Sequence, residues 1–257
     1  MKQLPFVLLA FCLMTTVVAP STCRADSAVV VGVDAYSNLP TSAQLDAPNN
    51  DADAMAAKLS AFGFHVTELK DADATRQGIL DALQNVAADA TASDRFVFYF
   101  AGHGQLAADR QGCILPSDVQ MGQPGSAAEG VITRDELYTA LMAVNATTRT
   151  AVIDAVNSGA MMHRGPVCYF VSCKSYERSY ADDMQGTSHC IFSYYFLKSL
   201  KSLDELWLPV KTGVITSVAH DTDNNQTPTI SVAYVNTKVF GGPHHRTHHW
   251  RRTLKSL

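Results

Sequence analysis

The chain contains few charged residues and no excess of basic ones. Lys, Arg, Asp and Glu make up 17% of its 257 residues, and the formal net charge is −4. A nucleic-acid-binding protein needs clustered Lys and Arg against the phosphates, and the one basic cluster, Arg246 to Lys255, lies at the end of the chain. Composition therefore argues against nucleic-acid binding. Its 47% apolar residues are enough for a large buried core.

The sequence also lacks the residue patterns of a metal site. No two cysteines are separated by only two residues, the spacing on which structural zinc sites are usually built. Asp118 and Asp135 could suggest calcium, but two separated acidic residues are too few ligands for that ion. We therefore predict no metal and no cofactor.

No apolar run is long enough to cross a bilayer comfortably. The run from Leu4 to Met14 follows the positive Lys2 and precedes small residues that end at Ala25, which is the order found in secretory signal peptides. We therefore predict a signal peptide over residues 1–25, with the small-residue segment Ala19-Pro20-Ser21 as a second possible cleavage site. The mature protein would be exported, periplasmic or secreted, without a stable membrane span.

Few cysteines would remain after export. Four thiols in an oxidising compartment allow three full sets of disulfides, and the sequence does not choose among them. They are Cys113, Cys168, Cys173 and Cys190.

The order of apolar segments predicts alternating strands and helices. Ala28 to Val33 and Arg95 to Phe100 are continuous apolar runs, typical of strands covered on both faces. Helical patterns begin at Pro48 and Thr75, and Thr133 to Glu136 forms a capping box for a third helix. We also expect a hairpin within Gly104 to Gly130 and a helix at His189 to Leu203. The remaining predicted strands are His65 to Leu69, Thr150 to Val156, Val167 to Cys173, Val214 to Ala219 and Thr229 to Val235. Such alternation implies an α/β fold in three layers, with a mostly parallel sheet covered by helices on both faces.

Polar motifs follow two of these predicted strands. His103 stands between two glycines after the strand that begins at Arg95, and Asp154 lies near the end of another strand. In parallel sheets, functional residues gather at the carboxyl ends of the strands. A histidine flanked by glycines can approach a substrate closely and act as a general base. Taken alone, a loop histidine without a role is the simpler interpretation.

Seven short segments, in their order along the chain, resemble those of metacaspases and related clan CD cysteine peptidases. They are Val31 to Tyr36, Asn50 to Met55, Phe98 to Gly104, Leu115 to Asp118, Ile132 to Leu137, Ile153 to Gly159 and Gln226 to Pro228. The resemblance covers about residues 28–235 and implies a caspase-like α/β sandwich, which we place at residues 26–240. The composition of residues 241–257 indicates a basic, His-rich tail. The resemblance also implies that His103 is the general base of a cysteine-type endopeptidase, and that Asp51 and Asp154 receive a basic substrate side chain.

The tail contains four histidines in two pairs. Pairs four residues apart bind a transition metal only if the segment is helical, and a solvated tail is the simpler interpretation. The histidines are His244, His245, His248 and His249.

The sequence departs from the family at the nucleophile. The family motif has Asp, a small residue and then Cys, with Ser-Gly two positions further on. Here Asp154, Ser158 and Gly159 are present, but Val156 stands in place of the cysteine. Valine has no nucleophile with which to form a thioester, and removing such a group typically slows turnover on the order of a million-fold. We therefore predict a pseudopeptidase that binds a basic peptide or a partner protein.

Two alternatives stay open. Cys173, at the end of the next predicted strand, could replace the missing nucleophile in an endopeptidase that cleaves after Arg or Lys, although a buried or disulfide-bonded cysteine is the simpler interpretation. Ser158 could act as the nucleophile only in a remodelled site. Alternatively, the domain could have a structural or interaction role with no ligand cleft. The presence of Asp51 and Asp154 favours a cleft that binds basic groups.

Overall fold

A six-stranded sheet forms the centre of the molecule. The structure is a computed structural model that describes residues 26–120, 128–203, 205–231 and 237–240. The strand order is β11-β8-β7-β3-β1-β2, and β11 alone is antiparallel to its neighbour. The strands are β1 (Ser27–Gly32), β2 (His65–Lys70), β3 (Arg95–Ala101), β7 (Thr148–Asp154), β8 (Val167–Val171) and β11 (Thr229–Ile230). The predicted mostly parallel α/β sheet is confirmed.

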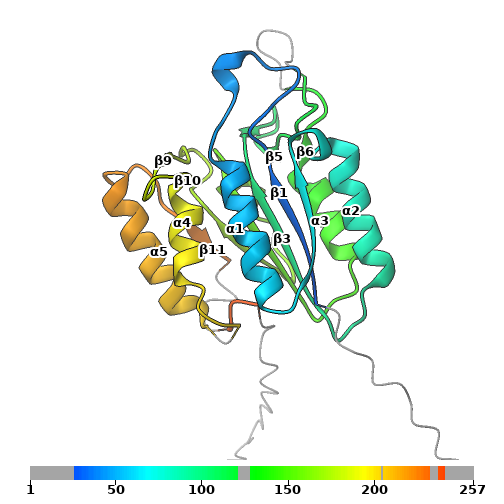
Figure 1. The fold of residues 1–257 in the computed structure, drawn as a ribbon. Coiled ribbons are helices and arrows are strands. Elements are labelled where there is room, and N and C mark those ends of the chain that lie inside the picture. Colours follow the sequence, from blue (N-terminus) through cyan, green and yellow to red (C-terminus); the bar gives the residue numbers. More distant parts are fainter. Residues whose placement is uncertain (1–25, 121–127, 204, 232–236, 241–257) are drawn as a thin grey trace, which may run out of the picture.

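Helices cover both faces of this sheet (Figure 1). One face carries α1 (Pro48–Ala61), α4 (Ile191–Ser199) and α5 (Trp207–Asp221), and the other carries α2 (Arg76–Asp89) and α3 (Arg134–Ala143). Each layer of helices encloses a separate apolar core against the sheet. The three-layer arrangement follows from strands that are apolar on both faces.

Alternating residues of the central strands supply the two cores. In β1, Val29 and Val31 belong to the core beneath α2 and α3, whereas Ala28 and Val30 belong to the core beneath α1. All six residues of β1 are buried. Burial on both faces is the reason that the sequence of this strand reads as a continuous apolar run.

Side-chain caps begin two of the helices where the sequence predicted them. The hydroxyl of Thr75 accepts the N–H of Gly78 at 3.0 Å at the start of α2. The hydroxyl of Thr133 accepts the N–H of Glu136 at 3.3 Å at the start of α3. Both bonds satisfy helix N–H groups that have no partner within the helix.

One predicted strand is wrong. Val214 to Ala219 lies within α5 and not in the sheet. The β-branched residues of this segment suggested a strand, but the buried residues Trp207, Val210, Val214 and Val218 follow helical spacing. They pack one side of α5 into the core that it shares with α4. Of the strand predicted at Thr229 to Val235, the structure has β11, and residues 232–236 lie outside the described residues.

Two small β-structures lie beside the sheet. β4 (Gly104–Leu106), β5 (Gly112–Ile114) and β6 (Ile132–Thr133) form a three-stranded antiparallel sheet, which confirms the hairpin predicted after Gly104. The sequence did not predict the second structure, a hairpin of β9 (Ala181–Asp183) and β10 (Ser188–Cys190). The side chain of Asn50 on α1 donates to the carbonyl oxygen of Ser188 at 2.9 Å. This bond helps to fix β10 against the first turn of α1.

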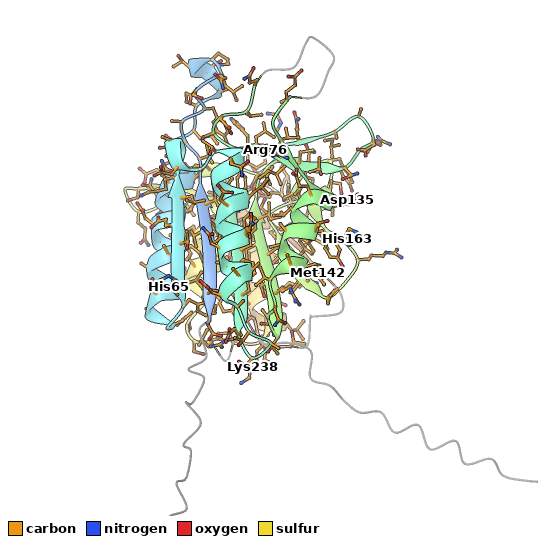
Figure 2. The ribbon with its side chains drawn as sticks, turned by 90° about the vertical axis from the view of Figure 1, so that its right-hand side faces the viewer. His65, Arg76, Asp135, Met142, His163 and Lys238 are labelled. Atoms are coloured by element: carbon orange, nitrogen blue, oxygen red, sulfur yellow. The ribbon has the colours of Figure 1, made fainter. Side chains whose placement is uncertain are left out.

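The described chain begins and ends at the amino edge of the sheet. Asp26 precedes β1 and accepts the N–H of Arg95 at 2.8 Å, at the start of β3. The carbonyl oxygen of Phe240 accepts the hydroxyl of Thr148 at 3.1 Å, at the start of β7. In Figure 2 the amino edge is at the bottom of the view, where His65 and Lys238 are labelled. The carboxyl edge, where the strands end, lies at the opposite side of the domain.

No helix in the described ranges is both long enough and apolar enough to cross a membrane. The predicted signal peptide at 1–25 and the predicted tail at 241–257 lie outside the described residues.

Candidate active site

A cleft of about 200 Å³ opens at the carboxyl edge, where β3 and β7 end side by side. The N–H of Gly102, after β3, donates to the carbonyl oxygen of Asp154, the last residue of β7, at 3.1 Å. The residues that line this cleft include Asp46, His103, Asp154, Val156, Ser179 and Cys190. Three of the four site residues expected from the sequence, His103, Asp154 and Val156, therefore line one cavity.

The backbone and the ring of His103 both have hydrogen-bond partners. Its N–H donates to the hydroxyl oxygen of Tyr36 at 2.7 Å, and the two rings lie with their centroids 4.8 Å apart. Ring atom Nε2 lies 2.7 Å from the carbonyl oxygen of Ala43. A carbonyl only accepts, so Nε2 must carry the hydrogen. In the neutral ring, Nδ1 then keeps its lone pair and can take a proton.

Val156 lies in a turn, two residues after the end of β7. The predicted strand was Thr150 to Val156, but β7 ends at Asp154, and Asn157 adopts a left-handed conformation with φ of +62°. The side chain of Val156 is half-buried and lines the cleft. The turn therefore presents position 156 to the cleft and does not bury it in the sheet.

The carboxylate of Asp154 is buried and held by two serines. Ser179 donates its hydroxyl to Oδ1. Ser193 donates its N–H to Oδ2 at 3.1 Å and its hydroxyl to the same oxygen at 2.7 Å. Burial raises the pKa of Asp154 to about 6; hydrogen bonds from the serine hydroxyls oppose that rise, and the charge of Asp51 adds to it. Asp154 is therefore mostly ionised at neutral pH.

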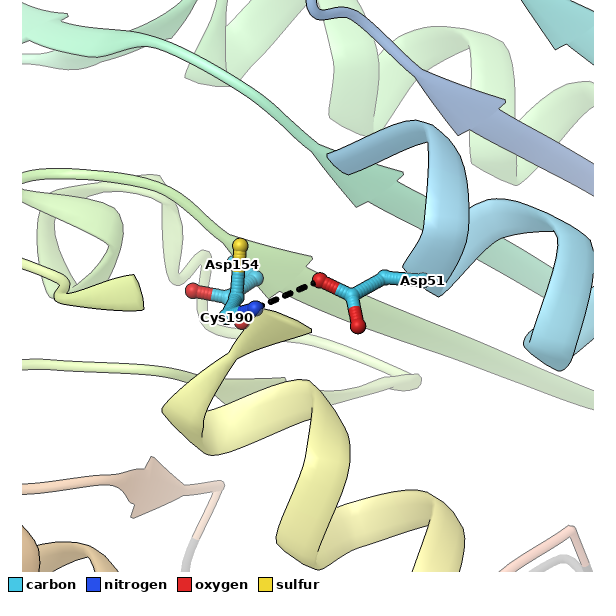
Figure 3. A group of neighbouring side chains, drawn as sticks. All are labelled: Asp51, Asp154 and Cys190. Atoms are coloured by element: carbon cyan, nitrogen blue, oxygen red, sulfur yellow. Dashed lines mark hydrogen bonds between the residues drawn. The ribbon is translucent and has the colours of Figure 1, made fainter. Parts of the chain in front are cut away.

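Asp51 lies beneath the cleft and not on its wall. It is on the first turn of α1 with none of its surface exposed. Its carboxylate accepts Nδ1–H of His189 at 2.7 Å and the N–H of Cys190 at 2.9 Å, the second of which is drawn in Figure 3. A carboxylate oxygen of Asp51, one of Asp154 and the sulfur of Cys190 all lie within 4.8 Å of one another. The two acids expected from the sequence are thus neighbours, but only Asp154 lines the cleft.

His189 opposes the effect of burial on Asp51. Burial raises the pKa of Asp51, while the hydrogen bond from His189 opposes that rise. The same hydrogen bond raises the pKa of His189. The hydrogen bond from His189 thus offsets part of the cost of burying the Asp51 carboxylate. After burial, the charge of the neighbouring Asp51 is a further cause of the raised pKa of Asp154.

The groups that could ligate a metal here already have hydrogen-bond partners within the protein. Asp51 is held by His189 and β10, and Asp154 is held by the two serines. Asp118 and Asp135, considered above for calcium, lie on separate elements. Asp118 accepts the N–H of Arg76 at 2.8 Å, and Asp135 pairs with Arg134. Each of these four acids is thus engaged by donors of the protein itself.

The four described cysteines are free and buried. Cys173 has none of its surface exposed, and its sulfur lies 3.3 Å from the carbonyl oxygens of Ala155 and Glu177. Burial raises the pKa of the Cys173 thiol. Ser158 is equally buried, and its hydroxyl lies 3.1 Å from that of Ser172. Neither group lines the cleft.

Cys190 is the thiol that does line the cleft. It is 9% exposed. Burial, followed by the neighbouring carboxylates of Asp154 and Asp51, raises the pKa of this thiol well above its usual value. The thiolate that acts as a nucleophile is therefore disfavoured at Cys190.

A loop between β8 and β9 forms part of the cleft wall and is fixed by a buried glutamine. The side-chain nitrogen of Gln226 donates to the carbonyl oxygen of Ser172 and to the hydroxyl of Ser179, both at 3.1 Å. Its side-chain oxygen accepts the N–H of Tyr180 at 3.0 Å. Sequence reasoning used Gln226 only as part of a family motif and did not identify Ser179, Ser193 or His189. No local pattern distinguishes these three residues from ordinary polar residues.

The match to a known family covers most of the chain. The model of the caspase domain family matches residues 25–240. The chain belongs to the caspase domain family. Among solved structures, caspase-1 from Spodoptera frugiperda is 16% identical with a TM-score of 0.63, and the match covers 86% of this chain and 92% of that one. Protein GSU0716 from Geobacter sulfurreducens is also 16% identical, with a TM-score of 0.61 and coverage of 85% and 99%.

At this identity the two structures support the fold alone. A comparison with curated proteins found no match. The caspase-like fold expected from the sequence is confirmed, and the chemical roles of His103, Val156, Asp51 and Asp154 remain predictions.

Proposed function

We propose that this caspase-domain protein does not cleave peptides and instead binds a basic side chain of a peptide or protein partner in its cleft. The observation that carries the proposal is the pairing of His103 with Val156. Both residues line the same cavity at the ends of adjacent strands. The histidine is oriented for proton transfer by Ala43, but the residue beside it in the cleft has no group that can attack a carbonyl.

The other thiols and hydroxyls near the cleft support the absence of cleavage. Cys173 and Ser158 are fully buried outside the cleft. Cys190 lines the cleft, but its thiolate would lie next to two carboxyl groups. A reactive cysteine usually needs an electropositive and partly exposed environment. This arrangement disfavours the alternative of an active endopeptidase that uses Cys173.

The charges around the cleft support a basic ligand. Asp154 and the exposed Asp46 line it, and neither Lys nor Arg is among the lining residues. Its volume of about 200 Å³ is below the roughly 300–1,000 Å³ of pockets that enclose a small molecule, so it suits one side chain of a longer ligand. An open cavity of this kind also disfavours the alternative of a structural domain without a cleft.

A combined cleavage and binding experiment tests the proposal. The protein is incubated with fluorescent peptides that contain Lys, Arg, Asp or norleucine at one central position. We expect no cleavage, no labelling by a peptide with a thiol-directed group, and binding of the basic peptides alone. Turnover that disappears in His103→Ala would overturn the proposed inactivity, and equal binding of the basic and acidic peptides would overturn the proposed ligand class.

A further inference from the structure

We infer that the cleft selects lysine over arginine, because Asp154 offers only one free acceptor position to a ligand. The inference rests on the proposed function and specifies which basic side chain the site takes. It follows from the hydrogen bonds that Asp154 already accepts, from the direction in which its two oxygens point, and from the position of Asp51 outside the cleft lining.

Protein donors occupy three acceptor positions on Asp154. An ionised carboxylate has about four such positions, two on each oxygen. Ser193 fills both positions on Oδ2 through its N–H and its hydroxyl. Ser179 fills one position on Oδ1. At most one position remains, and it belongs to Oδ1.

The two oxygens of Asp154 point in different directions. Ser193 has none of its surface exposed, so the oxygen that it holds faces the interior of the domain. Ser179 lines the cleft, so the oxygen that it holds lies on the cleft side. A ligand therefore meets a single carboxylate oxygen that it shares with a serine hydroxyl.

Arginine and lysine differ in what they need from a carboxylate. The planar guanidinium makes its strongest contact through two parallel N–H donors, one to each carboxylate oxygen. Asp154 cannot accept that pair without losing Ser193. The ammonium of lysine is a compact point charge with freely rotating donors, and one charged oxygen is enough for a strong contact. The remaining donors can be hydrated at the mouth of the cleft.

Neither neighbouring acid supplies the missing bidentate partner. Asp51 does not line the cleft, and His189 and Cys190 use its oxygens. Asp46 lies at the exposed rim, where its carboxylate accepts the hydroxyl of Ser188 at 3.1 Å. An ion pair at such an exposed position contributes little. Selectivity is therefore determined at Asp154, and Ser179 is the positioning residue on its cleft side.

Ser193 can keep its place on Asp154 because a buried tyrosine supports it. The hydroxyl oxygens of Tyr99 and Ser193 lie 2.6 Å apart, and the hydrogen of Ser193 is used by Asp154. Tyr99 is therefore the donor of that bond. The chain of donors from Tyr99 through Ser193 keeps Oδ2 turned inward.

The test compares three peptides that differ only at one central position, which is Lys, Arg or the neutral norleucine. Affinities are measured by isothermal titration calorimetry with the full chain at low salt. We expect the Lys peptide to bind roughly fivefold more tightly than the Arg peptide, and the norleucine peptide to bind at least about tenfold more weakly than the Lys peptide, as the loss of a charge-assisted hydrogen bond predicts. Arg binding as tightly as Lys, or more tightly, would overturn the selectivity while leaving the proposed function in place. Norleucine binding as tightly as both would overturn the proposed function itself.

Replacing the serine tests its role separately. Ser179→Ala frees a second position on the cleft-facing oxygen, so two guanidinium N–H groups can bind that one oxygen without displacing Ser193, and the ratio of Arg to Lys affinity should rise at least about threefold. Ser175→Ala, in the same loop but not on the cleft, is the matched control and should leave the ratio unchanged. An unchanged ratio in a folded Ser179→Ala protein would show that Ser179 does not position Asp154. If that variant does not fold, the comparison of Lys and Arg peptides on the native protein still decides the inference.

Discussion

The backbone of Gly104 packs directly against the carbonyl oxygen of Val156. A Cβ atom at position 104 would overlap that oxygen and would lie 3.0 Å from the Cβ of Ala155. The segment that follows His103 and the turn that carries Val156 are therefore held in contact, although one follows β3 and the other follows β7. A glycine at this position is what allows the two segments to meet at the cleft.

Gly104→Ala should destabilise the domain by roughly 1–3 kcal/mol, because the added methyl group forces the backbones apart. Thermal denaturation followed by circular dichroism measures the change. Gly213→Ala is the matched control, since position 213 lies within α5, is exposed and has open space around it. That change should stabilise the helix by about 0.5–1 kcal/mol. A neutral Gly104→Ala would contradict the close packing at Val156.

Restoring the thiol tests whether the rest of the site is intact. Val156→Cys removes one methyl group's worth of volume from a half-buried position, which should destabilise the protein by about 1 kcal/mol. The new thiol would lie in the cleft with His103, whose Nδ1 can take the proton. We expect cleavage of Lys peptides at least about a hundredfold above the native background, measured by release of a fluorophore.

The double variant Val156→Cys with His103→Ala is the control for that gain and should lose it. A folded Val156→Cys protein that neither cleaves nor reacts with a thiol-directed peptide would show that the site lacks more than its nucleophile.

The two buried acids should contribute unequally to binding. Asp154→Asn removes the carboxylate that faces the cleft and should weaken binding of a Lys peptide at least about tenfold. Asp51→Asn removes an acid that lies beneath the cleft and does not line it, so binding should change by no more than about twofold. Titration calorimetry on both variants, after their folding has been checked, measures the difference. Equal losses would show that Asp51 acts directly on the ligand.

The ionisation of Asp154 should give binding and stability opposite dependences on pH. Its pKa in the folded protein is raised from 3.8 to about 6. Binding of a basic peptide should therefore weaken as pH falls through about 6, because Asp154 takes up a proton. The folded state holds that proton more tightly than the unfolded state does. The contribution of Asp154 to the free energy of unfolding is thus fully present below about pH 4, and is lost as pH rises to about 6.

The lost contribution is at most about 3 kcal/mol. Denaturant titrations of the native protein and of Asp154→Asn between pH 4 and 8 isolate it as a difference. The raised pKa values of Asp51 and His189 also lower the free energy of unfolding as pH rises. Both groups are present in the two proteins compared, so the difference reports on Asp154. A difference that does not vary with pH would contradict the ionisation of Asp154 in this range.

Much of the fold was predictable because its signals are local. β1 and β3 are buried on both faces, and such strands have continuous apolar sequences. The hydroxyls of Thr75 and Thr133 cap helices within three residues. His103 and Asp154 were placed together because parallel strands end at one edge of a sheet.

The parts that were missed depend on contacts between distant residues. His189 lies 138 positions from Asp51, and Ser193 lies 39 positions from Asp154. Nothing in the sequence around either residue indicates which carboxylate it will meet. α5 was mistaken for a strand because β-branched residues favour strands, whereas the burial of Trp207 and Val214 on one side is settled by packing against the sheet.

The positions of Asp26 and Phe240 have a practical consequence. Both residues lie at the amino edge of the sheet, away from the cleft. A fluorescent protein, an affinity handle or a surface anchor fused at either position would start on the side of the domain remote from Asp154. The described domain can therefore be immobilised or joined to a second module by either end while its cleft faces outward, and the same orientation would serve for presenting it on a sensor chip.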